Sequence, residues 1–279
     1  MTPPPALKYT NKLQGRRVLV LGGSTGVGFC VAEAALEHGA HVTISSSNQK
    51  KLDAAVARLR KHAQAVGIAA VDSVVNAKTC DLASPEAVED NIVSLLEFAV
   101  RDGKLDHVVF TAGDALSIVP VGDITAADVQ RMGMVRHVGP IVLAKHLPKY
   151  INQAVGSSFT LTGGSNAWRP GPGWSVAASF GAALEGLARG LAIDLRPVRV
   201  NCVQLGAVHT ELFGGIPEDK LPAVLDSFRK EGITGTVGKP EEVAEAYIYC
   251  MKDSFATGAV VESNGGRLVG DLKGSFLFA

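Results

Sequence analysis

The sequence predicts an α/β protein with one doubly wound parallel sheet, formed by residues 1–279 as a single domain. The first observation is the segment LGGSTGVG at residues 21–28, which follows an apolar run at 17–21 (RVLVL) and precedes a helical pattern at 29–38. The second is that apolar runs alternate with helical patterns along the rest of the chain. Such alternation is typical of a parallel sheet, whose ligands bind beyond the carboxyl ends of the strands.

The glycine-rich turn gives this expected sheet a nucleotide site of Rossmann type. Gly22, Gly26 and Gly28 stand where the chain must turn tightly, let a pyrophosphate approach the backbone and pack a helix against a strand. The helix that follows directs free N–H groups and a partial positive charge at the phosphates. An ordinary tight turn between a strand and a helix is the alternative, because such a turn alone is a weak signal.

The remaining elements are read in order from apolar spacing and end signals. Residues 1–14 are expected to be a tail, because the prolines at 3–5 oppose a helix. The expected strands are 16–21, 41–45, 71–80, 105–111, 158–162, 198–205 and 259–262. The expected helices are 29–38, 48–65, one capped by Ser84 with Pro85 at its first position, 125–151 with interruptions at Gly133, Gly139 and Pro140, 176–193, 211–231 and 241–251. Residues 211–235 are expected to form a helical insert on the substrate side.

Composition limits the partners of this chain. Lysine plus arginine and aspartate plus glutamate number 27 each, so the neutral charge favours neither nucleic acid nor an anionic membrane. The four cysteines are far apart and lack metal-ligand spacing, which indicates buried thiols in a reducing compartment and no metal site. The N-terminus has no apolar signal core, and no run looks long enough to span a bilayer. A cytoplasmic protein is expected.

Seven short motifs, in this order and spacing, resemble the short-chain dehydrogenase/reductase family over nearly the whole chain. They are GGSTGVG (22–28), CDL (80–82), AG (112–113), AALEGL (182–187), RVNCVQLGAVHT (199–210), KPEEVAEA (239–246) and TGAVVESNGG (257–266). The resemblance implies a nicotinamide cofactor and assigns its contacts. The pyrophosphate would meet Gly22, Ser24, Thr25, Gly26, Val27 and Gly28, the adenine Asp81 and Leu82, the ribose Ala112 and Gly113, and the nicotinamide amide Val208 and Thr210. For Asp81, a helix N-cap is the alternative.

The end of the second expected strand favours NADP(H) over NAD(H). An NAD enzyme places a carboxylate here for the ribose 2′-hydroxyl, whereas this chain has Ser45, Ser46, Ser47 and Asn48, followed by lysines at 50 and 51. Hydroxyls, an amide and these lysines suit a 2′-phosphate. A polar turn without a ligand is the alternative.

The chain departs from the family at its catalytic residues. Counting back from AALEGL, the position of the family's tyrosine proton donor holds Ala177, and that of its lysine holds Gly181. The catalytic serine falls near residues 163–164, close to Ser165, and the helix asparagine falls near Arg136. Reduction of a ketone leaves an alkoxide that needs a proton, whereas reduction of an iminium leaves a neutral amine. The missing donor therefore indicates a substrate that is already cationic, or else a protein that binds nucleotide without chemistry.

The segment GGSNAWRPGPGW (163–174) replaces the usual donors and should lie beside the nicotinamide. Asn166 can orient a substrate amide but cannot act as an acid. Trp168 and Trp174 offer flat apolar walls, although core packing is the more natural role for Trp174. Arg131 and Arg136 lie on the preceding long helix and suit a phosphate or a substrate carbonyl, with a solvated helix face as the alternative.

This combination resembles a fungal branch of the family, the NADPH-dependent reductase/Diels–Alderases of prenylated indole alkaloids. The resemblance implies reduction of a cyclic iminium of a prenylated indole alkaloid intermediate, followed by an intramolecular cycloaddition, in a dimer or tetramer. It also implies catalytic roles for Arg131, Trp168 and residue 166. That group carries an aspartate at 166, so this chain resembles an Asp→Asn variant of it.

Two other functions stay open on the sequence. One is a ketone or alcohol oxidoreductase whose donor is His209 or Ser165. The other is an NADP(H)-binding protein without catalysis. Solvent deuterium incorporation and a substrate screen separate the oxidoreductase from the iminium reductase, whereas the binding protein would bind cofactor and oxidise no NADPH with any imine or ketone.

Overall fold

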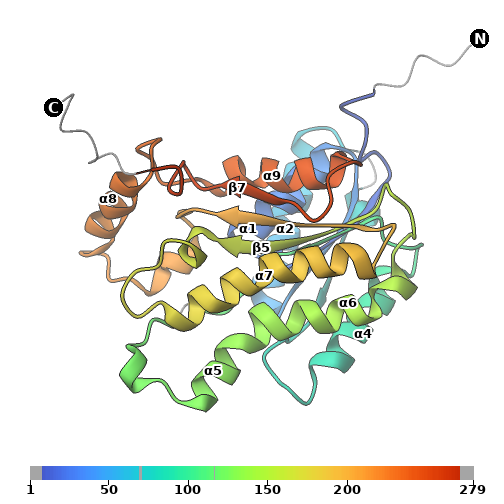
Figure 1. Cartoon of the computed structure of the whole chain (residues 1–279). Helices are drawn as coiled ribbons and strands as arrows, with labels where there is room; N and C mark the ends of the chain where they lie inside the picture. The colour runs from blue at the N-terminus through green and yellow to red at the C-terminus, as the bar shows by residue number, and fades with distance from the viewer. Residues whose placement is uncertain (1–7, 69–70, 116, 271–279) are drawn as a thin grey trace, which may run out of the picture.

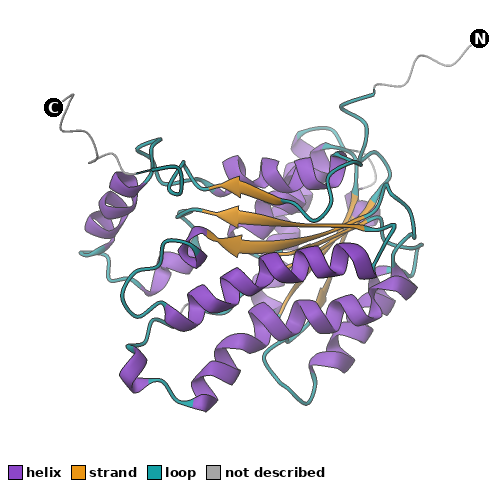
Figure 2. Ribbon diagram, viewed as in Figure 1, coloured by secondary structure: helices purple, strands orange, loops and turns teal. Residues whose placement is uncertain are grey.

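The computed structural model describes residues 8–68, 71–115 and 117–270. Its centre is a seven-stranded, all-parallel sheet in the order β3-β2-β1-β4-β5-β6-β7 (Figure 2). The strands are β1 Arg17–Leu21, β2 His41–Ser46, β3 Val75–Thr79, β4 His107–Phe110, β5 Ser158–Gly164, β6 Arg199–Leu205 and β7 Val260–Ser263. The order reverses between β1 and β4, as expected for a doubly wound sheet, so the predicted fold class is confirmed.

Helices cover both faces of the sheet. They are α1 Gly26–Glu37, α2 Gln49–Ala65, α3 Val71–Val74, α4 Val88–Ala99, α5 Ala126–Gly133, α6 Gly139–Tyr150, α7 Ser175–Asp194, α8 Leu221–Glu231 and α9 Pro240–Lys252, with short turns η1 Val121–Asp123, η2 Met134–Val138, η3 Ser165–Ala167 and η4 Glu211–Gly215. Two hydrophobic clusters fill the two faces, one including side chains of α4, α6 and α7 and the other including side chains of α1, α2 and α9. In Figure 1, α8 lies beyond the carboxyl ends of β5 and β7, on the side where ligands bind.

Several boundaries differ from those expected. The expected third strand, 71–80, is a helical turn followed by β3, and α4 begins at Val88 rather than beside Ser84. The expected tail falls partly on residues 1–7, outside the described residues, while Leu13 is fully buried against the α1 side of the sheet. Residue 13 therefore belongs to the core, because an apolar side chain there gains more from burial than from solvent.

The long helix expected at 125–151 runs through its glycines by changing type. The segment η2 is a π-helix between α5 and α6, and the carbonyl of Met134 accepts from the N–H of Gly139. A π segment inserts one residue into the turn and rotates the side chains that follow. This turn carries Arg136, whose guanidinium lies against Gly113 in the loop after β4.

The helix α7 corrects one expectation. It has 20 residues and is long and apolar enough, by length and composition, to cross a membrane, although no such run was expected. One face of α7 packs on β5 and β6, while Ala182, Gly186, Gly190 and Ile193 are exposed. The helix therefore behaves as a sheet-covering element that leaves a strip of small side chains and one isoleucine open.

Candidate functional site

The glycine turn between β1 and α1 forms a cradle that side chains would fill. Gly22 has a φ of +86°, and a Cβ built there would lie 2.6 Å from the backbone nitrogen of Ala112. A Cβ on Gly28 would overlap both Thr111 Oγ1 and the carbonyl oxygen of Gly22. The turn therefore packs directly on the loop after β4, and only glycine permits this approach at both positions.

The loop after β6 closes over the same turn. Gly26 has a φ of +53°, and a Cβ there would lie 3.1 Å from Thr210 Cγ2. Val208 is buried and pairs with Gly238 through an isolated bridge, while Thr210 Oγ1 accepts a hydrogen bond from the N–H of Leu212 at 3.3 Å. In the same turn Ser24 is buried, Thr25 is the N-cap of α1, and Val27 is half-buried. The structure thus brings together the residues expected at the pyrophosphate and the nicotinamide.

The end of β2 presents polar groups at increasing exposure. Ser45 is buried, Ser46 is half-buried, and Ser47 and Asn48 are exposed. Asn48 caps α2, because its Oδ1 accepts from the N–H of Lys51 at 2.9 Å. The exposed hydroxyl of Ser47 therefore lies at a helix N-terminus, where the free N–H groups favour an anion.

The expected adenine residues follow β3. Leu82 is buried, and Asp81 is exposed with its Oδ1 accepting from the N–H of Ala83 at 2.9 Å. The N-cap of α4 is Ala87, so Asp81 caps no helix and that alternative is wrong. Together with the glycine cradle and residues 112–113, which follow β4, these groups surround the carboxyl ends of neighbouring strands. This arrangement fits a nicotinamide dinucleotide.

No proton donor stands at the positions of the family's tyrosine and lysine. Ala177 and Gly181 lie in α7, and a Cβ on Gly181 would be 3.2 Å from the Cβ of Ala167. The turn η3 therefore packs against the helix where a lysine would emerge. Tyr247 lies near the end of β5 and contacts Thr162 Oγ1 at 2.8 Å, but it is fully buried, and burial raises the pKa of its hydroxyl. It has no access to a substrate.

The two arginines of the long helix lie in different environments. The Arg131 side chain is 59% exposed and pairs with Asp128 at 3.1 Å. Arg136, on the π turn, lies against Gly113 and donates to the carbonyl oxygen of Asp114, with its Nε 3.3 Å from the Asp114 carboxylate. Burial lowers the pKa of Arg136, opposed by the charge of Asp114. The structure brings Arg136 to the expected ribose loop and leaves Arg131 at the surface.

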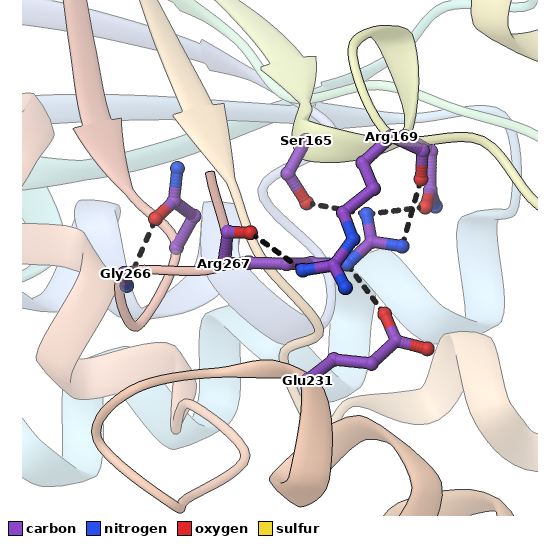
Figure 3. A network of polar contacts seen from close by, with 7 residues as sticks. Ser165, Arg169, Glu231, Gly266 and Arg267 are labelled. Carbon is purple, nitrogen blue, oxygen red and sulfur yellow. Dashed lines mark hydrogen bonds and ion pairs between the residues drawn. The ribbon is translucent and has the colours of Figure 1, made fainter. Parts of the chain in front are cut away.

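Asn166 and Ser165 share one cationic partner, Arg267 (Figure 3). The Nη1 of Arg267 lies 2.7 Å from Asn166 Oδ1 and 3.1 Å from Ser165 Oγ, and Nη2 donates to the carbonyl oxygen of Arg169 at 2.8 Å. The Nε of Arg267 donates to Glu231 at 2.6 Å. Arg267 is buried and comes directly after Gly265 and Gly266, in the turn that follows β7. A charged residue just past a strand's carboxyl end was the signal that sequence reasoning missed.

Trp168 presents its ring outward while its nitrogen is held inside. The residue is 64% exposed, yet its Nε1 donates to Glu185 Oε1 at 2.6 Å. Glu185 is buried on α7, and Gln204 of β6 donates to the same oxygen at 2.7 Å. The indole is therefore fixed by a carboxylate that sequence reasoning did not single out. Trp174 is half-buried, against Gly171.

The loops after β4, β5 and β6 are neighbours, because these strands are adjacent in the sheet. The loop after β5 is tied to the loop after β4 by the N–H of Val119, which donates to the Gly173 carbonyl at 3.2 Å. Exposed apolar side chains stand on all three loops: Ile118, Trp168 and Leu212. His209 is exposed, with its ring 6.1 Å from that of Phe213. This edge offers an apolar setting for a substrate beside the expected nicotinamide contacts.

Comparison with known proteins agrees with this geometry. Residues 9–269 match the model of the SDR-like Rossmann domain. The chain is 43% identical to short-chain dehydrogenase/reductase malC of Malbranchea aurantiaca, over 95% of this chain and 99% of that one. It is 40% identical to short-chain dehydrogenase/reductase fsr5 of Gibberella fujikuroi, over 94% and 98% of the two chains.

Solved structures give the same result. The structure of MalC reductase/Diels–Alderase from Malbranchea aurantiaca superposes with a TM-score of 0.88 at 42% identity, covering 94% of this chain and 99% of that one. A small-chain dehydrogenase in complex with NADPH has a TM-score of 0.72 at 24% identity, covering 92% of this chain and 100% of that one, and shares the fold.

The fold, the glycine cradle and these relatives agree on one class of protein, an oxidoreductase whose Rossmann fold binds a nicotinamide cofactor. The chain belongs to the short-chain dehydrogenase/reductase family.

Proposed function

We propose that this protein is an NADPH-dependent reductase of a cyclic iminium, derived from a prenylated indole alkaloid precursor, that also directs an intramolecular Diels–Alder cycloaddition. The observation that carries the proposal is the missing proton donor. Ala177 and Gly181 stand where the family has tyrosine and lysine, and η3 packs on Gly181. The similarity to MalC, named a reductase/Diels–Alderase, supports the same reaction class.

The chemistry of an iminium explains why this site needs no acid. The reduced nicotinamide, when bound, supplies a hydride to the electrophilic carbon. The two electrons of the new C–H bond come with the hydride, and the C=N π pair moves onto nitrogen, which becomes a neutral amine. No proton enters this step, so the residues need only hold the substrate and exclude water.

Three side chains are proposed to hold the substrate. Arg136 is half-buried beside the loop expected at the ribose and would contact a substrate carbonyl. Asn166 would hydrogen-bond a ring amide, and Trp168 would form one wall for the indole. Arg136 takes this role in place of Arg131, which faces solvent and pairs with Asp128.

The cycloaddition suits this kind of site. A pericyclic step needs the diene and the alkene in the correct relative orientation, and it needs neither acid nor base. The exposed side chains of Ile118, Trp168 and Leu212, on three neighbouring loops, offer apolar surface that would fold a prenyl group against the reduced ring.

The cofactor preference is proposed to be NADP(H). The exposed Ser47 precedes α2, whose N-terminus includes Lys50 and Lys51, and the last two residues of β2 and the two that follow, 45–48, include no carboxylate. A 2′-phosphate would meet hydroxyls, helix N–H groups and positive charge there.

The open strip of α7 is proposed to pack against a second copy of this chain. Its exposed positions 182, 186 and 190 are small, so two such helices can approach closely, and a long apolar helix exposed on one side gains by being covered. The assembly would be a dimer, or a tetramer through a second contact, with the substrate sites outside this helix face.

The deciding experiment measures NADPH oxidation at fixed protein concentration with a prenylated Pro–Trp-derived cyclic iminium and with a panel of plain ketones. The proposal expects oxidation with the iminium alone, a bicyclic product, and no solvent deuterium at the reduced carbon. Oxidation with ketones would instead reveal a proton donor such as His209 or Ser165. Cofactor binding with no oxidation by any substrate would identify a nucleotide-binding protein.

A further inference from the structure

Arg267 settles which atom of Asn166 faces the protein. An arginine side chain only donates hydrogen bonds, so the atom 2.7 Å from its Nη1 must be the amide oxygen of Asn166. The opposite end of the amide is the NH₂ group. Within the described part of the chain, Nδ2 of Asn166 has no hydrogen bond and is not a buried atom lacking a partner, so it reaches solvent. The contact with Arg267 therefore fixes the orientation of this amide.

The guanidinium is itself held from several sides. Its Nε donates to Glu231 at the end of α8, its Nη2 donates to the Arg169 carbonyl, and its own backbone carbonyl accepts from Arg169 Nη1 at 3.0 Å. The Arg267 side chain is 10% exposed, and Glu231 balances its charge. A buried arginine whose side chain has four hydrogen-bond partners loses little further freedom and acts as a rigid donor toward η3. Figure 3 shows these contacts converging on Arg267.

We infer that Arg267 is a positioning residue that determines the polarity of the group residue 166 presents to the substrate. With asparagine at 166, Arg267 takes the oxygen and the NH₂ group faces the cleft, which suits a neutral carbonyl acceptor such as a ring lactam. With aspartate at 166, one oxygen pairs with Arg267 and the other faces the cleft as an anionic acceptor, which suits a cationic ring nitrogen. The inference rests on the proposed place of residue 166 in the substrate site.

A titration that needs no substrate tests the contact. The Asn166→Asp variant adds one carboxyl resonance to a ¹³C NMR spectrum, assigned by subtraction of the parent spectrum. An opposite charge at hydrogen-bond distance lowers a carboxyl pKa by about 1–3 units. We expect the pKa of the introduced carboxyl to lie below the usual value near 3.9 with Arg267 present, and to rise by about 1 unit or more in Asn166→Asp/Arg267→Met.

Arg169→Met in the same background is the matched control. Arg169 belongs to the same network, but its side chain donates to the backbone of Arg267 and not to residue 166. It should move the pKa of the introduced carboxyl by less than half as much. A carboxyl pKa that is the same with arginine and methionine at 267 would overturn the inference. If the methionine variant does not fold, Arg267→Gln removes the charge while keeping a polar side chain, and an unchanged pKa of the introduced carboxyl there overturns the inference equally.

A binding panel tests the polarity. A piperazin-2-one and a piperazinium of the same ring size are titrated against the NADPH complex of each variant. A single hydrogen bond corresponds to about a 2- to 10-fold change in affinity. We expect the parent to favour the lactam, Asn166→Asp to favour the cation, and Arg267→Met to lose the preference in both backgrounds. Equal preferences in all four proteins would contradict the inference, whereas failure of NADPH oxidation alone would contradict only the proposed reaction.

Discussion

The indole nitrogen of Trp168 donates a 2.6 Å hydrogen bond to the buried carboxylate of Glu185, so an exposed ring is anchored from inside the fold. An exposed aromatic side chain on a loop ordinarily samples several rotamers, and ordering it on binding costs entropy. Here the order exists before any ligand binds. Trp168 is therefore suited to serve as a rigid wall.

Trp168→Ala should raise the KM for the iminium about tenfold or more, because the apolar wall is lost. Trp168→Phe keeps an aromatic surface but leaves the bond to Glu185 unmade, so KM should rise less, and the free energy of unfolding should fall by about 1 kcal/mol. Steady-state kinetics and chemical denaturation measure the two effects. Trp174→Phe is the control, and an unchanged KM in Trp168→Ala would remove Trp168 from the site.

Two lysines of α2 test the proposal that the N-terminus of this helix binds the 2′-phosphate of NADP(H). Lys51→Ala, at the N-terminal end of α2, should weaken NADPH binding about 2- to 5-fold and leave NADH binding unchanged, because an exposed charge contact contributes less than about 1 kcal/mol. Lys61→Ala, further along the same helix and also exposed, should change neither. Dissociation constants from cofactor fluorescence give the comparison.

A carboxylate near the expected 2′-phosphate should have a larger effect. Ser47→Asp should weaken NADPH binding about tenfold or more by charge repulsion and should favour NADH through the ribose hydroxyls. If the parent binds NADH more tightly than NADPH, the preference proposed here is wrong at the outset.

The open face of α7 predicts how the chain assembles. A Cβ on Gly186 would meet nothing within 4 Å in the single chain, so Gly186→Trp should fold normally. In a dimer packed through α7 the same side chain would block close approach of the two helices. In analytical ultracentrifugation we expect the variant to have the mass of one chain and the parent to have the mass of two chains or more.

Gly156→Trp is the matched control for this assembly. It too has no neighbour within 4 Å of its Cβ, and it lies on the loop before β5, outside α7. It should leave the assembly unchanged. A parent that sediments as one chain, or a Gly186→Trp variant that still assembles, would exclude this interface.

Acid should destabilise the fold through His107. Burial lowers the pKa of this side chain from 6.5 to about 3, and its Nδ1 lies 2.9 Å from Ser158 Oγ. The unfolded chain takes up a proton near pH 6.5, whereas the folded chain keeps the ring neutral down to about pH 3. The free energy of unfolding therefore falls as the pH drops from about 6.5 toward 3. The stability that the neutral, buried His107 allows is fully present above pH 6.5.

His107→Asn should flatten this dependence between about pH 6 and 4, because asparagine does not titrate while it keeps a polar atom near Ser158. Urea denaturation at a series of pH values measures the slope. His209→Asn, on an exposed loop, is the control and should retain the parent slope. If the free energy of unfolding of His107→Asn falls with pH as steeply as that of the parent, other groups cause the acid sensitivity.

Much of the fold follows from the sequence because its signals are local. Alternating apolar runs place seven strands, and steric limits at Gly22 and Gly28 place the nucleotide turn. Element boundaries differ from those expected where local signals conflict. Ser84 and Pro85 look like a helix start, yet α4 begins at Val88, and the glycines at 133 and 139 are absorbed by a π turn instead of ending the helix.

The sequence by itself determined the sheet, the glycine cradle and the absence of tyrosine and lysine at 177 and 181, since each depends on a few consecutive residues. Only the tertiary structure decided that Arg136 rather than Arg131 reaches the loop after β4, and that Arg267 holds Asn166 from 101 positions away. The physical reason is that a side-chain contact between distant segments depends on strand order and helix rotation. Neither strand order nor helix rotation can be inferred from the two residues that make the contact.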